Sequence, residues 1–305
     1  MDAIGMAVSA GRESEQPASS TSPAGPASLQ SAYDWCAGVA RSHYENFTIA
    51  SWLMPAAMRK HMYAIYAYAR IADDFADEQH DPARLDEWER ELDLAYAGSP
   101  RHPVFVALAD TVRRFEIPRE PFADLLVAFR RDIDFAGFET LEDLLGYSRY
   151  SANPVGRLVL YLFGHRDPGR QHLSDLICSG LQLANFWQDV AIDLGKGRVY
   201  LPRCDMAQFG VTAGQLARGV VDGKFAALLK HEVAVARALL VEGSDLSRLV
   251  DRRLRRDILM FAGGGLAILR AIEGAGFDVF RGRPKLSKAD YLKLGWNAFR
   301  GRLES

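Results

Sequence analysis

Apolar residues recur at spacings of three and four residues along most of the chain from Tyr33 onward. The spacing is clear in MRKHMYAIYAYARIADDFADE, PFADLLVAFRRDIDF and KFAALLKHEVAVARALLVEG. An apolar stripe of this period predicts an amphipathic α-helix. No alternating run is long enough for a sheet, and the short RVYLP at 198–202 is the one candidate strand. The pattern therefore predicts an all-α fold.

Proline, glycine and aspartate interrupt the helical pattern at Pro55, around Pro82, in GSPRHP, in IPREP, around Pro168 and in GRPKLS. Such residues typically end one helix and precede the next. Residues 1–30 are mostly Ser, Ala, Pro and Gly, a composition that buries too little apolar surface to offset the entropy of ordering. We therefore expect a disordered tail over 1–30 and a single helical domain over 31–305.

The composition narrows the class of protein. Of the 305 residues 49% are hydrophobic, enough for a sizeable core, and a formal net charge of -2 gives no bulk attraction to nucleic acid. Cys36, Cys178 and Cys204 form no C-x-x-C pair, so we expect them in the packed core of a protein kept in the reducing cytoplasm. We find no signal peptide and no apolar run of about 18 residues, so no membrane span is expected.

A first predicted helix carries acidic residues on one face. In YAIYAYARIADDFADE, residues Tyr66, Arg70, Asp73 and Asp77 are spaced by four, three and four, so they form one stripe. Asp74 lies about 100° round the helix from Asp73, on the flank of this stripe.

A second polar stripe follows in LQLANFWQDVAIDLGKGRVYLP. Gln182, Asn185, Asp189 and Asp193 are spaced by three, four and four, and the positions around them are apolar. A polar stripe on an otherwise apolar helix should face a polar region inside the protein.

Carboxylates four residues apart repel each other and destabilise an isolated helix. A divalent cation would offset this repulsion, and Mg²⁺ is commonly held by one or two carboxylates together with substrate phosphates. Arg70 and Arg198 would then hold phosphate oxygens through forked hydrogen bonds, with Lys196 adding charge. The two stripes therefore predict a magnesium and diphosphate site. Solvated helix faces are the plainer alternative for either acidic pair.

The same segments resemble the squalene and phytoene synthase family, from about Tyr33 to about Lys288. The similarity is carried by HYENF at 43–47, YAYARIADDFADE, GYSRYSANPVG at 146–156 and QLANFWQDVAIDLGKGRVYLP. The resemblance implies an all-helical isoprenoid synthase fold with one central cavity.

The resemblance also implies roles for particular residues, with roughly two or three Mg²⁺ ions bound beside the diphosphate. The residues that match metal ligands are Asp73, Asp77, Asn185, Asp189 and Asp193. Those that match catalytic groups are Tyr66, Arg70 and Tyr147. The positions expected to bind substrate are His43, Asn46, Gln182, Gln188, Arg198 and Tyr200.

Two features depart from the usual family pattern. Serines commonly follow the first histidine, where this chain has Tyr44 and Asn46, and the residue before Asp189, commonly Arg, is Gln188. The combination of HYENF, DDFADE and NFWQDV looks most like the bacterial hydroxysqualene synthases of hopanoid pathways. That likeness implies presqualene diphosphate as substrate and water as the group that quenches the cation.

Ionising a carbon–diphosphate bond needs stabilisation of the leaving charge, and the carbocation then needs an apolar, aromatic cavity. Tyr147, Phe129, Phe47 and Phe186 are candidates for its walls, with ordinary core packing as the alternative. No strand followed by G-x-G-x-x-G and a helix is found, and we expect no NADPH. Gly263–Gly265 should instead permit close helix packing.

Two rival functions stay open beside water quenching. One is the head-to-head condensation of two prenyl diphosphates, and the other is a non-catalytic assembly partner, against which the intact aspartates argue. The preferred function implies hand-off from a presqualene diphosphate synthase and to a hydroxysqualene reductase.

The C-terminal segment KADYLKLGWNAFRGRLES mixes lysine and arginine with aromatic residues and leucine. This mixture is typical of an interfacial helix, which would place the protein at the inner face of the membrane. A terminal helix docked on the core is the alternative. The arginines within 252–256 are expected on a solvated face.

Overall fold

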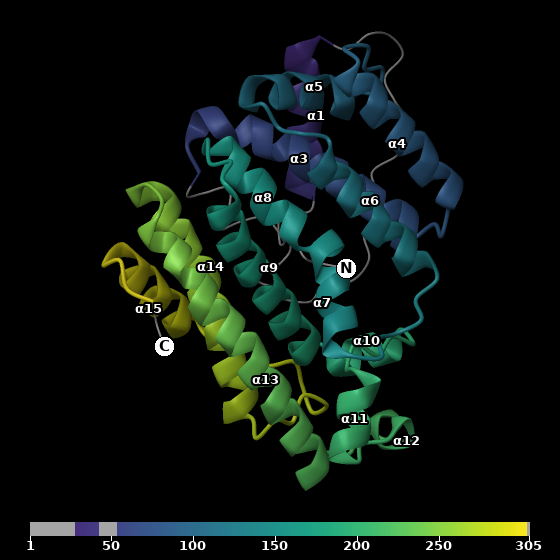
Figure 1. Ribbon diagram of the computed structural model, residues 1–305, viewed down its shortest axis with the longest axis vertical. Helices are drawn as coiled ribbons and strands as arrows, with labels where there is room; N and C mark the ends of the chain where they lie inside the picture. The colour runs from purple at the N-terminus through teal and green to yellow at the C-terminus, as the bar shows by residue number, and fades with distance from the viewer. Residues whose placement is uncertain (1–27, 43–53, 304–305) are drawn as a thin grey trace. The chain divides into compact units, whose positions relative to one another are not determined.

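The computed structural model describes residues 28–42 and 54–303 (Figure 1). Within these two ranges every regular element is a helix, which confirms the predicted all-α fold. The segment 198–202 is neither helix nor strand, so the expectation of a strand there is wrong. Its Tyr200 and Leu201 are buried by side-chain packing rather than by pairing with another strand.

Contacts between residues divide the chain into two compact units, which are described separately below. Among the described residues, the first unit lies within Met1–Asp134 and Pro154–Arg166, and the second lies within Phe135–Asn153 and Asp167–Ser305. The single domain expected over 31–305 stays a prediction. Most of the expected tail lies outside the described residues, but the first helix already begins at Leu29.

The first unit is built around its longest helix, α3. Its helices are α1 (Leu29–Ser42), α3 (Ala56–Asp77), α4 (Pro82–Tyr96), α5 (Pro103–Phe115), α6 (Glu120–Ile133) and, from its second residue on, α8 (Asn153–Leu162). α3 packs against α1, α4, α5 and α6. Tyr68 of α3 is fully buried, and its hydroxyl donates a hydrogen bond to the carbonyl of Phe122 at 2.9 Å. These contacts hold α3 in a fixed rotation and so fix the direction of its acidic stripe.

The second unit is built around α9. Its helices are α7 (Leu141–Ser151), α9 (Pro168–Gln188), α10 (Val190–Gly195), α11 (Arg203–Phe209), α12 (Ala213–Ala217), α13 (Gly223–Gly243), the 3₁₀ helix η2 (Ser244–Arg248), α14 (Arg252–Gly274) and α15 (Lys288–Phe299). α9 packs along both α13 and α14, and α15 packs on α14. Prolines begin several helices of both units, as the interruptions in the sequence predict.

Close helix packing is confirmed at two of the three consecutive glycines at 263–265 in α14. A Cβ added at Gly265 would lie 2.8 Å from side-chain atoms of Leu181 and Leu240, and one at Gly263 would lie 3.0 Å from Leu294. A Cβ at Gly264 would meet no atom within 4 Å. Gly263 and Gly265 therefore let α15 and α9 approach α14.

The cysteines differ in burial. Cys36 is buried, Cys178 is partly buried and Cys204 is exposed. The prediction of a core position is confirmed for Cys36 and wrong for Cys204, because α11 is a short helix with no buried residue. No helix in the described part of the chain combines the length and the apolar character needed to cross a membrane.

Candidate active site

The first acidic stripe lies on α3, as predicted. Tyr66 and Asp73 are buried, while Arg70 and Asp77 are partly exposed. Nη1 of Arg70 donates to Oδ2 of Asp73 at 3.4 Å, and the same guanidinium pairs with Asp74. Arg70 therefore offsets the repulsion between carboxylates on its own helix.

The second stripe is divided between two helices. α9 ends at Gln188, and Asp189 caps it with φ -105° and ψ 12° before α10 begins at Val190. Hydrogen bonds of the α-helical type nonetheless continue across the break. Asp189 N donates to Asn185 O and Asp193 N donates to Asp189 O, each at 2.9 Å. The predicted register of the stripe is therefore kept.

Gln182 begins the second stripe, about two turns before Asp189. The side chain is buried, and neither its Oε1 nor its Nε2 has a hydrogen-bond partner among the described residues. Burying an unpaired polar group costs about 1–3 kcal/mol. A polar ligand at this position would supply the missing partners.

A residue that the sequence analysis did not single out also reaches the second stripe. Arg283, in the loop between α14 and α15, donates from Nε to Oδ1 of Asp189 at 2.5 Å and from Nη2 to Oδ2 at 2.8 Å. Its Nη2 lies 3.5 Å from Oδ1 of Asn185. Gln188 anchors the same loop by donating its side-chain amide hydrogen to the carbonyl of Pro284. Asp189 thus has a forked guanidinium partner although Gln188 precedes it.

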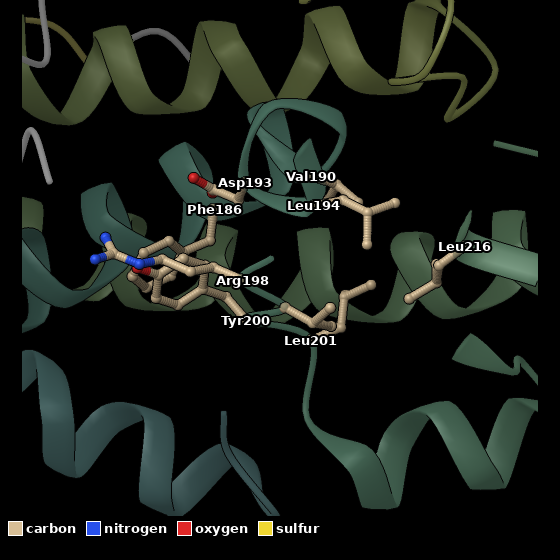
Figure 2. A pocket seen from close by; sticks show the side chains of 9 residues that line it. Phe186, Val190, Asp193, Leu194, Arg198, Tyr200, Leu201 and Leu216 are labelled. Atoms are coloured by element: carbon tan, nitrogen blue, oxygen red, sulfur yellow. The ribbon is translucent and has the colours of Figure 1, made fainter. Parts of the chain in front are cut away.

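Asp193 lines a pocket formed by the end of α9, α10 and the segment that follows (Figure 2). The other lining residues are Phe186, Val190, Leu194, Arg198, Val199, Tyr200, Leu201 and Leu216. In Figure 2 the guanidinium of Arg198 lies at one end of the pocket and Leu216 at the other. Burial, together with the nearby Asp189, raises the pKa of Asp193 to about 6. A cation bound here would favour the ionised carboxylate.

Aromatic side chains of the second unit form one cluster beside this pocket. Phe186 and Tyr200 stack with ring centroids 3.8 Å apart and an interplanar angle of 9°. The ring of Phe138 lies 6.0 Å from Tyr200 and 5.3 Å from Tyr147. Ring contacts therefore link three predicted site residues: Phe186 contacts Tyr200 directly, and Phe138 joins Tyr200 to Tyr147. Phe129 is buried within the first unit.

The donor set bears on which metal could bind. The ranges covered by the structure contain no group of three or more His, Cys, Asp and Glu side chains arranged to hold one ion. They offer instead two aspartate pairs, the second accompanied by the amide of Asn185. Such sparse oxygen donors fit Mg²⁺, which usually keeps waters and substrate phosphates among its ligands. Three predicted residues lie outside the described ranges, namely His43, Asn46 and Phe47.

Sequence comparison with known proteins supports the family resemblance that the motifs indicate. The model of the squalene/phytoene synthase family matches residues 40–290. The 15-cis-phytoene synthase of Synechocystis sp. is 31% identical over 293 residues, covering 88% of this chain and 86% of that protein.

Solved structures give the same result. Squalene synthase HpnC from Alicyclobacillus acidocaldarius is 42% identical with a TM-score of 0.79, covering 82% of this chain and 96% of that one. A dehydrosqualene synthase in complex with ligand is 28% identical with a TM-score of 0.81, covering 88% of this chain and 96% of that one. These structures confirm the isoprenoid synthase fold. The protein is therefore a member of the squalene/phytoene synthase family, whose members are enzymes that act on prenyl diphosphates.

Proposed function

We propose that this protein ionises presqualene diphosphate and quenches the resulting cation with water, giving hydroxysqualene. The observation that carries the proposal is the 42% identity with squalene synthase HpnC, compared with 31% for 15-cis-phytoene synthase. The combination of HYENF, DDFADE and NFWQDV supports the same choice.

The proposed reaction breaks the carbon–oxygen bond to diphosphate, and the bonding electron pair leaves with the diphosphate. The cyclopropylcarbinyl cation then rearranges, and its ring opens by breaking a carbon–carbon bond as the oxygen of a water molecule bonds to the cation. One proton is released. No electrons are gained or lost, so the reaction consumes no NADPH.

Mg²⁺, when bound, would neutralise charge on the departing diphosphate. Its ligands would be Asp73, Asp77, Asn185, Asp189 and Asp193. Arg70 and Arg198 would bind phosphate oxygens, because a guanidinium donates forked hydrogen bonds to them. The buried amide of Gln182 would gain its missing polar partner from the same diphosphate.

The aromatic cluster would serve the second half of the reaction. The rings of Tyr147, Phe186 and Tyr200 present negative faces that attract a carbocation without bonding to it. They would also exclude all but the reacting water from the cation. Tyr66 lies one turn before Arg70 on the acidic stripe and would contact the diphosphate from there.

Head-to-head condensation of two prenyl diphosphates is the second candidate, and the similarity to phytoene synthases favours it. Under the preferred function the protein would receive its substrate from a presqualene diphosphate synthase and pass its product to a hydroxysqualene reductase, in the cytoplasm. A non-catalytic assembly partner is the third candidate.

The test is mass spectrometry of lipid products from purified protein and Mg²⁺ without NADPH, incubated with presqualene diphosphate and separately with farnesyl diphosphate. Hydroxysqualene from the first substrate is expected. Presqualene diphosphate made from the second would instead favour the condensing enzyme. If neither product forms and Mg²⁺ with diphosphate fails to raise the melting temperature, the assembly partner gains support.

A further inference from the structure

Helix α15 leaves an apolar stripe uncovered. Leu292, Trp296 and Phe299 follow one another at spacings of four and three residues, so they share one face of the helix. A different face carries Leu294 and Ala298, which are buried. α15 packs on α14, as Figure 1 also shows. The exposed stripe therefore takes no part in holding the helix in place.

The exposure of this stripe stands out within the molecule. Leu292, Trp296 and Phe299 are 77%, 60% and 59% exposed, and no other large apolar side chain in the described ranges exceeds 46%. Trp296 and Phe299 stack with ring centroids 6.3 Å apart, so they form one ridge. Large apolar side chains gathered in this way usually mark a binding surface.

Cationic side chains border the stripe on both sides. Lys288 lies one turn before Leu292, on one side of the stripe. Lys293 and Arg300 lie on the other side, roughly 80–100° round the helix from Leu292. All three cationic residues are exposed. The only acidic residue of α15, Asp290, is engaged in the capping box with Ser287 at the start of the helix. The exposed face therefore carries net positive charge.

Two guanidinium groups also lie over the aromatic ridge. The Cζ atom of Arg300 is 5.9 Å from the ring centroid of Trp296, and that of Arg256 on α14 is 4.9 Å from the ring centroid of Phe299. Positive charge is thus placed directly beside the apolar side chains, and it comes from α14 and from the residue that caps α15.

We propose that this face of α15 docks on the surface of a lipid bilayer that contains anionic lipid. Trp, Phe and Leu side chains are suited to the boundary between headgroups and acyl chains, while lysine and arginine bind the headgroups. A second copy of the chain is a poorer partner, because a symmetric contact would bring two basic borders together. The inference goes beyond the proposed function and does not depend on it.

The test is co-sedimentation of the full chain with phosphatidylcholine vesicles, with and without phosphatidylglycerol, in the absence of substrate and Mg²⁺. We expect binding that needs phosphatidylglycerol and weakens with added salt. The double variant Leu292→Glu/Trp296→Glu should bind at least about tenfold more weakly. The matched control is Val220→Glu/Val241→Glu, which places two acidic groups at sites that are 46% and 45% exposed.

The control variant should bind like the unmodified chain, and circular dichroism should show both variants folded. A second readout is the fluorescence of Trp296, which should shift to shorter wavelength with anionic vesicles and lose that shift in Trp296→Phe. Equal binding by both double variants would overturn the proposal. The proposal would also be overturned if the unmodified chain did not bind anionic vesicles but formed a dimer, and if Leu292→Glu/Trp296→Glu dissociated that dimer.

Discussion

Arg70 and Arg283 each place a guanidinium against carboxylates that the proposed metal site needs. Arg70 pairs with Asp73 and Asp74 on its own helix, and Arg283 reaches Asp189 from a distant loop. A guanidinium that binds a carboxylate oxygen occupies lone pairs that a metal ion would otherwise use. Arginine and cation therefore compete for the same oxygens, and the competition can be measured residue by residue.

Replacing Arg283 with glutamine should strengthen the binding of Mg²⁺ alone. The substitution removes a forked, charge-assisted contact from Asp189, and losing such a competitor corresponds to about a tenfold gain in affinity. Isothermal titration calorimetry without substrate measures this directly.

The matched control for that experiment is Arg281→Gln. Arg281 lies two residues earlier in the same loop but pairs with Asp278 instead of Asp189. Its replacement should leave the affinity for Mg²⁺ unchanged. Weaker Mg²⁺ binding by Arg283→Gln alone would mean that Arg283 holds Asp189 in place for the metal rather than competing with it.

At the scale of the helices, the close packing of α9 on α13 depends on glycine, which has no side chain, at two contact positions. A Cβ at Gly243 would lie 2.7 Å from Cγ1 of Ile177 and 2.8 Å from the carbonyl oxygen of Leu173. A Cβ at Gly180 would lie 2.8 Å from Cγ of Leu240. The Cβ at Gly180 would also lie 3.1 Å from the carbonyl oxygen of Ala236. Backbone atoms cannot rotate away as a side chain can, and they lie nearer to the Cβ at Gly243, so Gly243 is the less tolerant of the two sites.

Gly243→Ala should lower the free energy of unfolding by about 1–3 kcal/mol, because the added methyl group forces the two helices apart. Gly264→Ala is the control, since a Cβ there meets nothing within 4 Å. Alanine favours a helix interior over glycine by about 0.8–1.0 kcal/mol, so the control should be neutral or stabilising. Urea denaturation measures both. Similar losses in the two variants would contradict the close approach at Gly243.

The elements also show which features can be predicted from the sequence. Both polar stripes could be predicted, because residues three and four apart share a helix face whatever the tertiary structure. The break at Asp189 could not be predicted, because no proline or glycine lies beside it in the sequence. The helical register nonetheless continues across the break. The contact of Arg283 joins residues 94 apart and leaves no periodic signal. The exposure of Cys204 could not be predicted either, because it depends on how the short helix α11 packs and not on a local sequence pattern.

For the whole molecule, buried carboxyl groups tie stability to pH. Burial and the neighbouring Asp205 raise the pKa of Glu232 to about 8. Burial, assisted by Asp251, raises the pKa of Asp257 to about 7. The ordinary pKa values of these two groups are 4.5 and 3.8. Between its ordinary and its raised pKa, each group holds its proton in the folded protein but loses it in the unfolded chain. Stability should therefore fall as pH rises through this window.

Glu232→Gln should make the stability of the protein less dependent on pH. A single carboxyl group that stays protonated on folding lowers the free energy of unfolding by at most about 1.4 kcal/mol for each pH unit between its two pKa values. Glutamine has nearly the same shape and does not titrate, so the fall in melting temperature between pH 5.5 and 8 should become smaller. The exposed Glu242→Gln on the same helix should keep the slope of the unmodified chain. If Glu232→Gln kept that slope as well, Glu232 would be ionised in the folded protein at pH 5.5 already, and a bound or paired cation would have to accompany it in the core.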